Sequence, residues 1–182
     1  MNKNVKFQMK IISLLFQYPD EGFGRSLPLM AGCIEGLPRT SARTKLIRFI
    51  SILQTTPLIR LQETYTQTFD LNPSTCLNLT YHLLGNAENR GKVMAHLQQI
   101  YHDAGYETIS GELPDYLPLM LEFLSECPEP AGLNRLRPYL APVEKLADLL
   151  KDSGNPYSSL LDVVRDMVRQ RRADDRGRIT ED

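Results

Sequence analysis

The chain of 182 residues is poor in several residue types that mark particular classes of protein. It has three cysteines, three histidines, no tryptophan and a formal net charge of only −1. Cys33, Cys76 and Cys127 are widely separated and odd in number, which disfavours both a disulfide framework and a zinc knuckle. The near-zero charge disfavours a nucleic-acid binder that relies on phosphate contacts. This use of cysteine fits a reducing compartment, so we expect a cytoplasmic protein that has no nucleic acid as a partner.

Long apolar runs are missing as well. No run approaches the roughly 20 residues that a membrane-spanning helix needs. The segment 1–20 places basic residues before apolar ones, as a signal peptide does, but Ser13 interrupts its apolar run and no small-residue cleavage site follows. We therefore expect this segment to be a helix of the mature protein, and we expect no stable association with a membrane.

The chain also lacks the alternating pattern of strands, and nearly every segment has the apolar spacing of a helix. Val5, Met9 and Ile12, for example, fall on one helical stripe. We predict an all-α, single-domain bundle of about eight to ten helices over residues 1–172. Beyond it the apolar period is lost and charges of both signs mix, which predicts a frayed or disordered tail at residues 173–182.

Three helix starts share one signature, a capping residue followed by proline. The cap oxygen can accept a hydrogen bond from an unpaired N–H, and proline lacks the N–H that would otherwise be unpaired at the first helical position. The pairs are Thr56-Pro57, Asn72-Pro73 and Asn155-Pro156.

A fourth start lies in "ELPDYLPLMLEFL", residues 112–124. Either Asp115 caps the helix and Pro118 lies in its first turn, or Pro118 is the first helical residue after a turn. In both cases acids gather at the helix N-terminus, where the helix dipole favours each by about 0.3–1 kcal/mol. Helix formation therefore explains these carboxylates without acid–base catalysis.

The apolar arc of this helix is unusually wide. At about 100° per residue, the apolar side chains of residues 117–127 cover roughly 200°, whereas a helix that rests on one core needs only about 100°. Two interpretations stay open. The helix is central in the bundle, or it offers one apolar side, rimmed by acids, to the helix of a partner.

Motifs of catalysis are missing. The sequence has no phosphate-binding glycine loop and no nucleophile elbow, and its histidines lack the i, i+4 spacing of a metal pair. We expect no catalytic residue, no bound metal and no cofactor of its own. The rival hypothesis is a small helical enzyme or nucleotide-binding regulator that uses His82, Arg90 and Asp115, which requires the three side chains to converge.

Three segments carry a resemblance to a known family: "LLFQYPD", "YTQTFDLNPSTCLNLTYHLLGNAENRGKVM" and "ELPDYLPLMLEFL". In order and spacing they resemble the NarJ family, the assembly chaperones of respiratory nitrate reductase, also called its delta subunit, within the TorD-like group. The resemblance covers about residues 10–165. One departure follows Gly85, where the family usually has acidic, small, arginine and acidic residues and this chain has "NAEN" at residues 86–89.

The resemblance implies a cytoplasmic, all-helical chaperone without catalytic activity. Such a chaperone binds the N-terminal leader of the molybdenum-containing catalytic (alpha) subunit and holds the apoenzyme until the molybdenum cofactor and an iron–sulfur centre are inserted. It is not a subunit of the finished enzyme. Another molybdoenzyme of the same superfamily is the alternative client.

The resemblance also implies which residues bind the leader. Apolar and aromatic members are expected to contact its apolar face, while Asp115 and Glu122 offer acidic contacts. The expected peptide-binding residues are Tyr65, Phe69, Asp70, His82, Arg90, Asp115, Tyr116, Leu117, Met120, Leu121 and Glu122.

Overall fold

The computed structural model describes residues 3–85, 88–108, 111–127 and 130–179, without the side chains of 130–131 and 170–179. Within these residues the chain forms helices and no strand, which confirms the predicted all-α class. The helices are α1 (Lys3–Leu15), α2 (Glu21–Glu35), α3 (Ser41–Thr55), α4 (Leu58–Tyr65), α5 (Leu79–Leu84), α6 (Asn89–Asp103), α7 (Leu117–Glu126), α8 (Pro130–Leu136), α9 (Val143–Asp152) and α10 (Ser158–Ile179). A π-helical turn, η1 (Thr66–Asp70), continues α4, and a 3₁₀ turn, η2 (Arg137–Leu140), continues α8.

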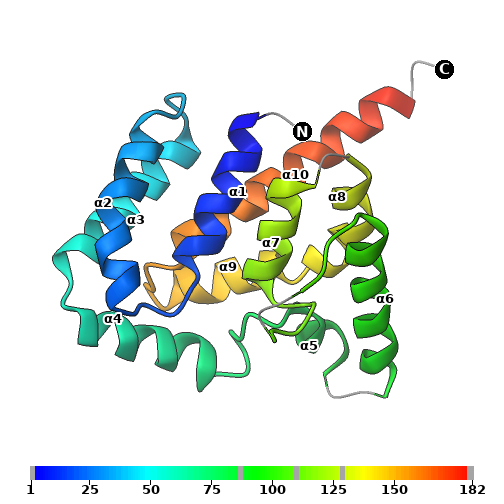
Figure 1. Cartoon of the computed structure of the whole chain (residues 1–182), viewed down its shortest axis with the longest axis horizontal. Helices are drawn as coiled ribbons and strands as arrows, with labels where there is room; N and C mark the ends of the chain where they lie inside the picture. Colours follow the sequence, from blue (N-terminus) through cyan, green and yellow to red (C-terminus); the bar gives the residue numbers. More distant parts are fainter. Residues whose placement is uncertain (1–2, 86–87, 109–110, 128–129, 180–182) are drawn as a thin grey trace.

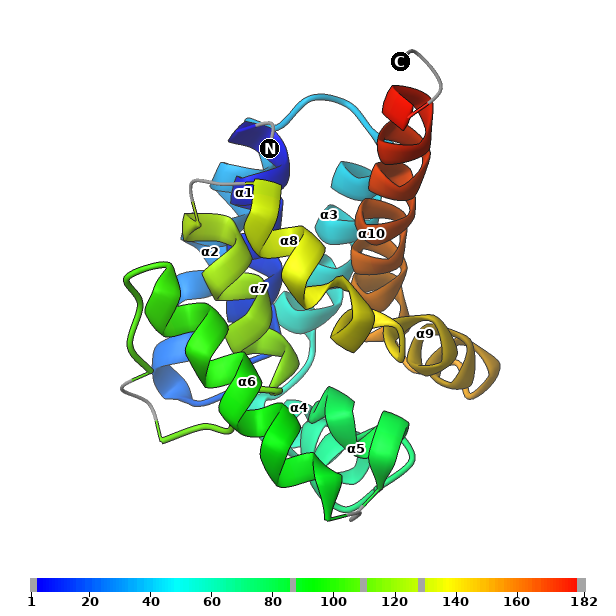
Figure 2. The same cartoon turned by 90° about the vertical axis from the view of Figure 1, so that its right-hand side faces the viewer.

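The N-terminal helix occupies the middle of the molecule. α1 packs along α7 and also contacts α10, although these helices are far apart in the sequence (Figure 1). α2 and α3 form an antiparallel pair at one side, and α10 packs on α3 and α9. Turning the molecule by 90° shows α6 beside α7 and α5 below them (Figure 2). This arrangement sets α7 between α1 and the α6 side of the bundle.

The wide apolar arc of α7 follows from that position. Leu117, Met120 and Leu121 are each 0 % exposed, and Phe123 and Leu124 are also buried. Burial on this scale is typical of a central helix, the first of the two interpretations of the sequence. The three predicted contact residues Leu117, Met120 and Leu121 therefore lie in the core in this conformation.

Local sequence predicted some helix ends in part. The Asn155 side-chain oxygen accepts a hydrogen bond from the Tyr157 N–H at 3.0 Å, but α10 begins at Ser158, so Asn155-Pro156 forms the turn before the helix rather than its cap and first residue. Gly105 follows α6 with a φ of +81°, the left-handed conformation expected of a glycine after a helix. Residues 86 and 87 of the departure after Gly85 lie outside the described residues.

Two predicted starts are wrong. Thr56 ends α3, because its hydroxyl donates back to the Ile52 carbonyl at 2.7 Å, and no side-chain cap bonds the start of α4. Asn72 accepts a hydrogen bond from the Ser74 N–H and only shapes a turn. The helix begins at Leu79 instead, since Asn78 before it is extended and pairs with Tyr116 in the segment before α7.

The C-terminal helix continues beyond the end of the apolar period. α10 is helical to Ile179, past the predicted boundary at residue 172. Residues 180–182 lie outside the described residues. Fraying is a matter of helix stability rather than of assigned conformation, so the frayed tail stays a prediction.

Candidate functional site

Asp115 is the centre of a buried polar network. It is 0 % exposed, and its carboxylate accepts hydrogen bonds from the Asn78 amide at 3.1 Å and from the Thr80 N–H at 3.1 Å. The Thr80 hydroxyl also donates to it, and the Arg90 guanidinium lies 3.3 Å from the same oxygen. Every bond made by this carboxylate therefore ties the segment before α7 to α5 and α6.

Asp115 does not cap α7, which rules out the first of the two alternatives for this helix start. Tyr116 occupies the cap position, with Pro118 in the first turn, and it makes no side-chain cap bond. Asp115 instead satisfies the unpaired N–H groups at the start of α5, because its backbone oxygen accepts from Leu79 and its carboxylate from Thr80. The acid serves a helix N-terminus as expected, but that of another helix.

The network also decides against the rival enzyme hypothesis. Arg90 and Asp115 do meet, but the carboxylate is fully buried and both its oxygens are hydrogen-bonded. His82 Nε2 lies 2.8 Å from the Cys76 carbonyl, which can only accept, so the imidazole donates there. The described residues contain no cluster of three or more potential metal ligands. The carboxylate that the rival hypothesis needs is thus buried and fully engaged in holding the fold together.

A short backbone pairing beside the network positions Tyr116. The Leu117 N–H donates to the Leu77 carbonyl at 2.9 Å, and Asn78 and Tyr116 form an isolated antiparallel bridge. The bridge fixes the backbone of Tyr116, whose hydroxyl lies 3.0 Å from that of Tyr65. Tyr116 of the "PDY" segment is thereby held against Tyr65 of the "YTQTFD" segment.

We call the hollow at this junction the tyrosine pocket. It has a volume of about 260 Å³ and collects side chains from four separate stretches of the chain. The π-helical turn η1 contributes two of them, and π-turns are frequent at functional sites. The lining residues are Tyr18, Tyr65, Phe69, Asp70, Leu77, Asn78, Glu112 and Tyr116.

The hydroxyl groups in this pocket have defined roles. The Tyr65 hydroxyl donates its single hydrogen to the Phe16 carbonyl at 3.0 Å, so Tyr116 must donate to Tyr65. The Tyr116 oxygen is left as an acceptor. Burial raises the pKa of Tyr65 and of Tyr116, and the carboxylates of Glu112 and Asp70 raise the pKa of Tyr116 further, so both phenols stay neutral.

The tyrosine pocket is suited to a cation. Its polar lining includes the carboxylates of Asp70 and Glu112, and no lysine or arginine is among the described residues that line it. The rings of Tyr18 and Tyr65 meet edge to face, with centroids 5.5 Å apart. Carboxylates and aromatic faces both attract ammonium and guanidinium groups, so the pocket can hold the end of a basic side chain.

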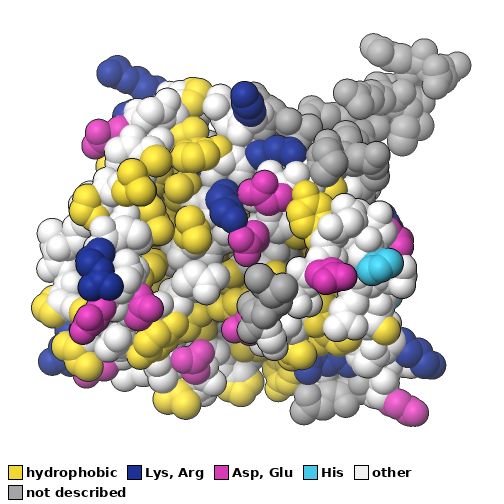
Figure 3. Space-filling model, in the orientation of Figure 1, with side chains coloured by type: hydrophobic (Ala, Val, Ile, Leu, Met, Phe, Trp, Pro, Cys, Tyr) yellow, Lys and Arg dark blue, Asp and Glu magenta, His cyan; other side chains and the backbone are white. Residues whose placement is uncertain are grey.

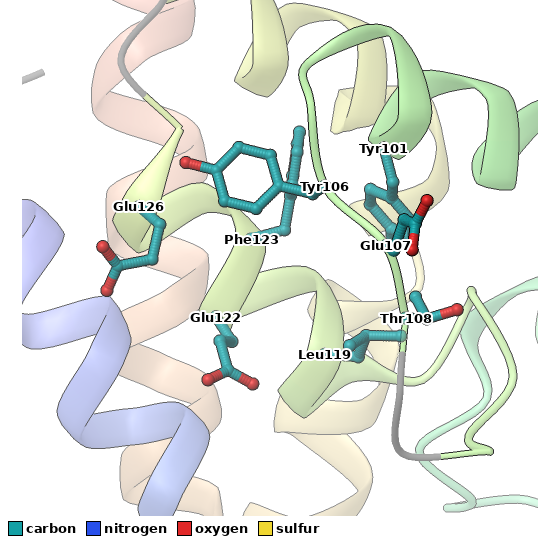
Figure 4. A pocket seen from close by; sticks show the side chains of 8 residues that line it. All are labelled: Tyr101, Tyr106, Glu107, Thr108, Leu119, Glu122, Phe123 and Glu126. Carbon is teal, nitrogen blue, oxygen red and sulfur yellow. The ribbon is translucent and has the colours of Figure 1, made fainter.

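A second hollow, which we call the α7 pocket, lies between α7 and the segment after α6 (Figure 4). It has a volume of about 250 Å³, and the Tyr106 and Phe123 rings meet edge to face within it. The side chains of Glu122 and Glu126 point toward α1 (Figure 4). Its lining residues are Tyr101, Tyr106, Glu107, Thr108, Leu119, Glu122, Phe123 and Glu126.

The structure therefore divides the predicted site residues into four groups. The tyrosine pocket contains Tyr65, Phe69, Asp70 and Tyr116, the α7 pocket contains Glu122, the polar layer beside them contains His82, Arg90 and Asp115, and the core contains Leu117, Met120 and Leu121. The other four lining residues of the tyrosine pocket were not among the predicted peptide-binding residues; they are Tyr18, Leu77, Asn78 and Glu112. All four lie within the segments that carry the family resemblance, and that resemblance was the available signal.

Comparison with known proteins agrees with this fold and these motifs. A solved structure described as a redox enzyme maturation protein from Archaeoglobus fulgidus superposes with a TM-score of 0.67 at 23 % identity, covering 90 % of this chain and 93 % of the other. The chain thus has the all-helical fold of that structure. Residues 36–161 match the family described as "Nitrate reductase delta subunit".

Two relatives are similar over most of their length. The "Probable nitrate reductase molybdenum cofactor assembly chaperone NarJ" of Bacillus subtilis is 34 % identical over 153 residues, which is 84 % of this chain and 83 % of that protein. The "Nitrate reductase molybdenum cofactor assembly chaperone NarJ" of Escherichia coli K12 is 30 % identical over 160 residues, with coverages of 86 % and 67 %. The chain belongs to the nitrate reductase delta subunit family, which confirms the resemblance.

Both relatives are named as assembly chaperones rather than as catalysts. Among the helices that the structure describes, none combines the length and the apolar character needed to cross a bilayer.

Proposed function

We propose that this protein is a system-specific chaperone that binds the N-terminal leader of the nitrate reductase catalytic subunit. The observation that supports it best is the tyrosine pocket, where segments around residues 18, 65–70, 77–78 and 112–116 meet. Its aromatic walls and its two carboxylates favour a basic side chain with apolar neighbours. A leader helix that carries both kinds of residue on one face has this chemistry.

Membership of the family supports a wider role, which is part of the same proposal. The chaperone holds the apoenzyme in the cytoplasm while the molybdenum cofactor and the iron–sulfur centre are inserted, and it leaves before the enzyme docks at the membrane. It is not a subunit of the finished enzyme. In this role the bound leader is released intact, so the site needs reversible contacts and no reacting group.

Titration calorimetry with a synthetic leader peptide tests the proposal. We expect a dissociation constant in the micromolar range, which corresponds to about −8 kcal/mol. Leaders from other molybdoenzymes serve as comparison ligands. Absence of binding to the folded protein by the nitrate reductase leader would reject the proposed client, and tight binding of a different leader would identify another.

A charge-matched pair of variants tests the location. Asp70→Asn combined with Glu112→Gln removes both pocket carboxylates, and we expect about tenfold weaker binding because charge-assisted hydrogen bonds are lost. Glu35→Gln combined with Asp152→Asn makes the same change in net charge at exposed positions outside the pocket and should leave affinity within about twofold. Equal affinities of the two double variants would place the leader elsewhere.

A further inference from the structure

The α7 pocket has an apolar floor and an acidic rim. Phe123 is 5 % exposed and packs against Tyr101 and Tyr106, with ring centroids 4.7 Å and 5.4 Å away. Leu119 is partly exposed and extends the floor. Three glutamates line the pocket, and no lysine or arginine is among the described residues that do so. It shares no lining residue with the tyrosine pocket.

A cation from the chain itself already rests on this rim. The Lys10 ammonium reaches across from α1 and lies 2.6 Å from a carboxylate oxygen of Glu122 and 4.0 Å from one of Glu126. Figure 3 shows basic and acidic side chains meeting in the middle of this face, over α1 and α7. The two carboxylates therefore bind an ammonium group in the geometry observed.

The contact made by Lys10 is exchangeable. The Lys10 side chain is 34 % exposed, and the side chains of Glu122 and Glu126 are 49 % and 56 % exposed. Ion pairs as accessible as this are weak and are screened by salt, so another cation can replace the lysine at little cost. Lys6, by contrast, donates to the carbonyls of Glu126 and Cys127 and holds α1 on α7 independently.

We propose that the α7 pocket is a docking site for a basic, apolar-flanked segment of a partner protein. The partner's lysine or arginine replaces Lys10 on Glu122 and Glu126, and its apolar neighbour packs on Tyr106, Leu119 and Phe123. Lys10 acts as an intramolecular placeholder that lowers the affinity for the partner. This site is separate from the leader site proposed above, so one polypeptide can occupy each.

Tryptophan fluorescence provides a direct test, since the chain has no tryptophan of its own. The probe is a short synthetic peptide with one tryptophan, flanking leucines and two arginines. A matched probe carries citrulline in place of each arginine. Burial of the probe's tryptophan on the apolar floor should shift its emission to the blue, and titration of the full-length protein gives the affinity.

The chain offers a matched control for Lys10. Lys45 also contacts two carboxylates four residues apart, Asp162 at 3.8 Å and Asp166 at 3.2 Å, outside the α7 pocket. We expect Lys10→Met to tighten binding of the arginine probe about two- to fivefold, the range of an exposed ion pair, and Lys45→Met to leave it unchanged. Both variants lose one positive charge, so a difference between their affinities for the arginine probe reports an effect of the α7 pocket rather than of net charge.

Neutralising the two glutamates of the rim should weaken binding of the arginine probe, the opposite of the effect expected for Lys10→Met. Glu122→Gln with Glu126→Gln should weaken the arginine probe about three- to tenfold and leave the citrulline probe unaffected, which isolates the ion pair. Three results would each overturn the proposal: a probe that does not bind, Lys10→Met behaving as Lys45→Met does, or a rim variant that binds as wild type. Leader binding measured on the same variants stays intact if the two sites are separate.

Discussion

At the scale of single residues, Asp115 shows how a buried charge can organise a surface. Its carboxylate is removed from water, and that cost is offset by hydrogen bonds from Asn78 and Thr80 and by the guanidinium of Arg90. The same bonds hold the two segments whose pairing orients Tyr116. A residue with no exposed atom therefore determines the shape of the tyrosine pocket.

We expect Asp115→Asn to destabilise the protein by about 2–4 kcal/mol, since an amide would face the donors at Thr80 and leave the Arg90 guanidinium without its carboxylate partner. Urea denaturation followed by circular dichroism measures the loss. Glu63→Gln, which breaks the exposed pair with Arg60, is the control and should change stability by no more than about 0.5 kcal/mol. Similar losses in both variants would show that the Asp115 network contributes little.

At the scale of the element, α7 is both the central helix of the bundle and the wall of a pocket. Its faces differ because Leu117, Met120 and Leu121 point into the core, whereas Leu119 and Glu122 line the α7 pocket. Mutations on the two faces should separate stability from binding.

Leu121→Ala should lower the free energy of unfolding by about 2–5 kcal/mol, because it leaves a cavity among tightly packed neighbours. Leu119→Ala should cost only about 1 kcal/mol, since part of its side chain is already in water. Urea midpoints at constant m-value report both changes. A smaller loss of unfolding free energy for Leu121→Ala than for Leu119→Ala would mean that the core is not packed as described.

At the scale of single helices, one kind of sequence rule predicted the structure well and another kind did not. Apolar periodicity depends on side chains of one helix facing one core, so it predicted the helical class and the wide arc of α7. Capping rules look only a few residues ahead, so they failed at Asp115, whose partners come from distant segments. Thr80 lies 35 residues before Asp115, so no local rule could pair them.

The same limit applies to the candidate site. Tyr65, Phe69, Asp70 and Tyr116 were predicted from their motifs and do meet in one pocket. No spacing rule could separate them from Leu117, Met120 and Leu121, because accessibility is set by the packing of α7 against other helices.

At the scale of the whole molecule, buried phenols link folding to pH. Burial raises the pKa of Tyr65, Tyr101, Tyr116 and Tyr157 above the value of 10.0 for free tyrosine. The folded state therefore keeps these protons at a pH where the unfolded chain releases them. Their contribution to stability is fully present below about pH 10 and is lost as the pH rises beyond it.

We expect the free energy of unfolding to fall above about pH 10 by about 1.4 kcal/mol per pH unit for each such tyrosine. Urea titrations across this range measure the slope. Tyr157→Phe should reduce the slope by the contribution of one tyrosine. It should change stability little at neutral pH, since the Tyr157 hydroxyl has no hydrogen-bond partner among the described residues. An unchanged slope in this variant would contradict the assignment.

The packing of α1 on α7 also sets an order of events during synthesis. Lys10 and its partner Glu122 are 112 residues apart, and the apolar face of α1 is covered by helices that the ribosome makes much later. At about 5–20 residues per second, the first helix waits on the order of 5–20 seconds for the seventh. During that interval the apolar face of the nascent α1 is uncovered, so this member of a chaperone family itself begins synthesis with an exposed apolar helix at its N-terminus.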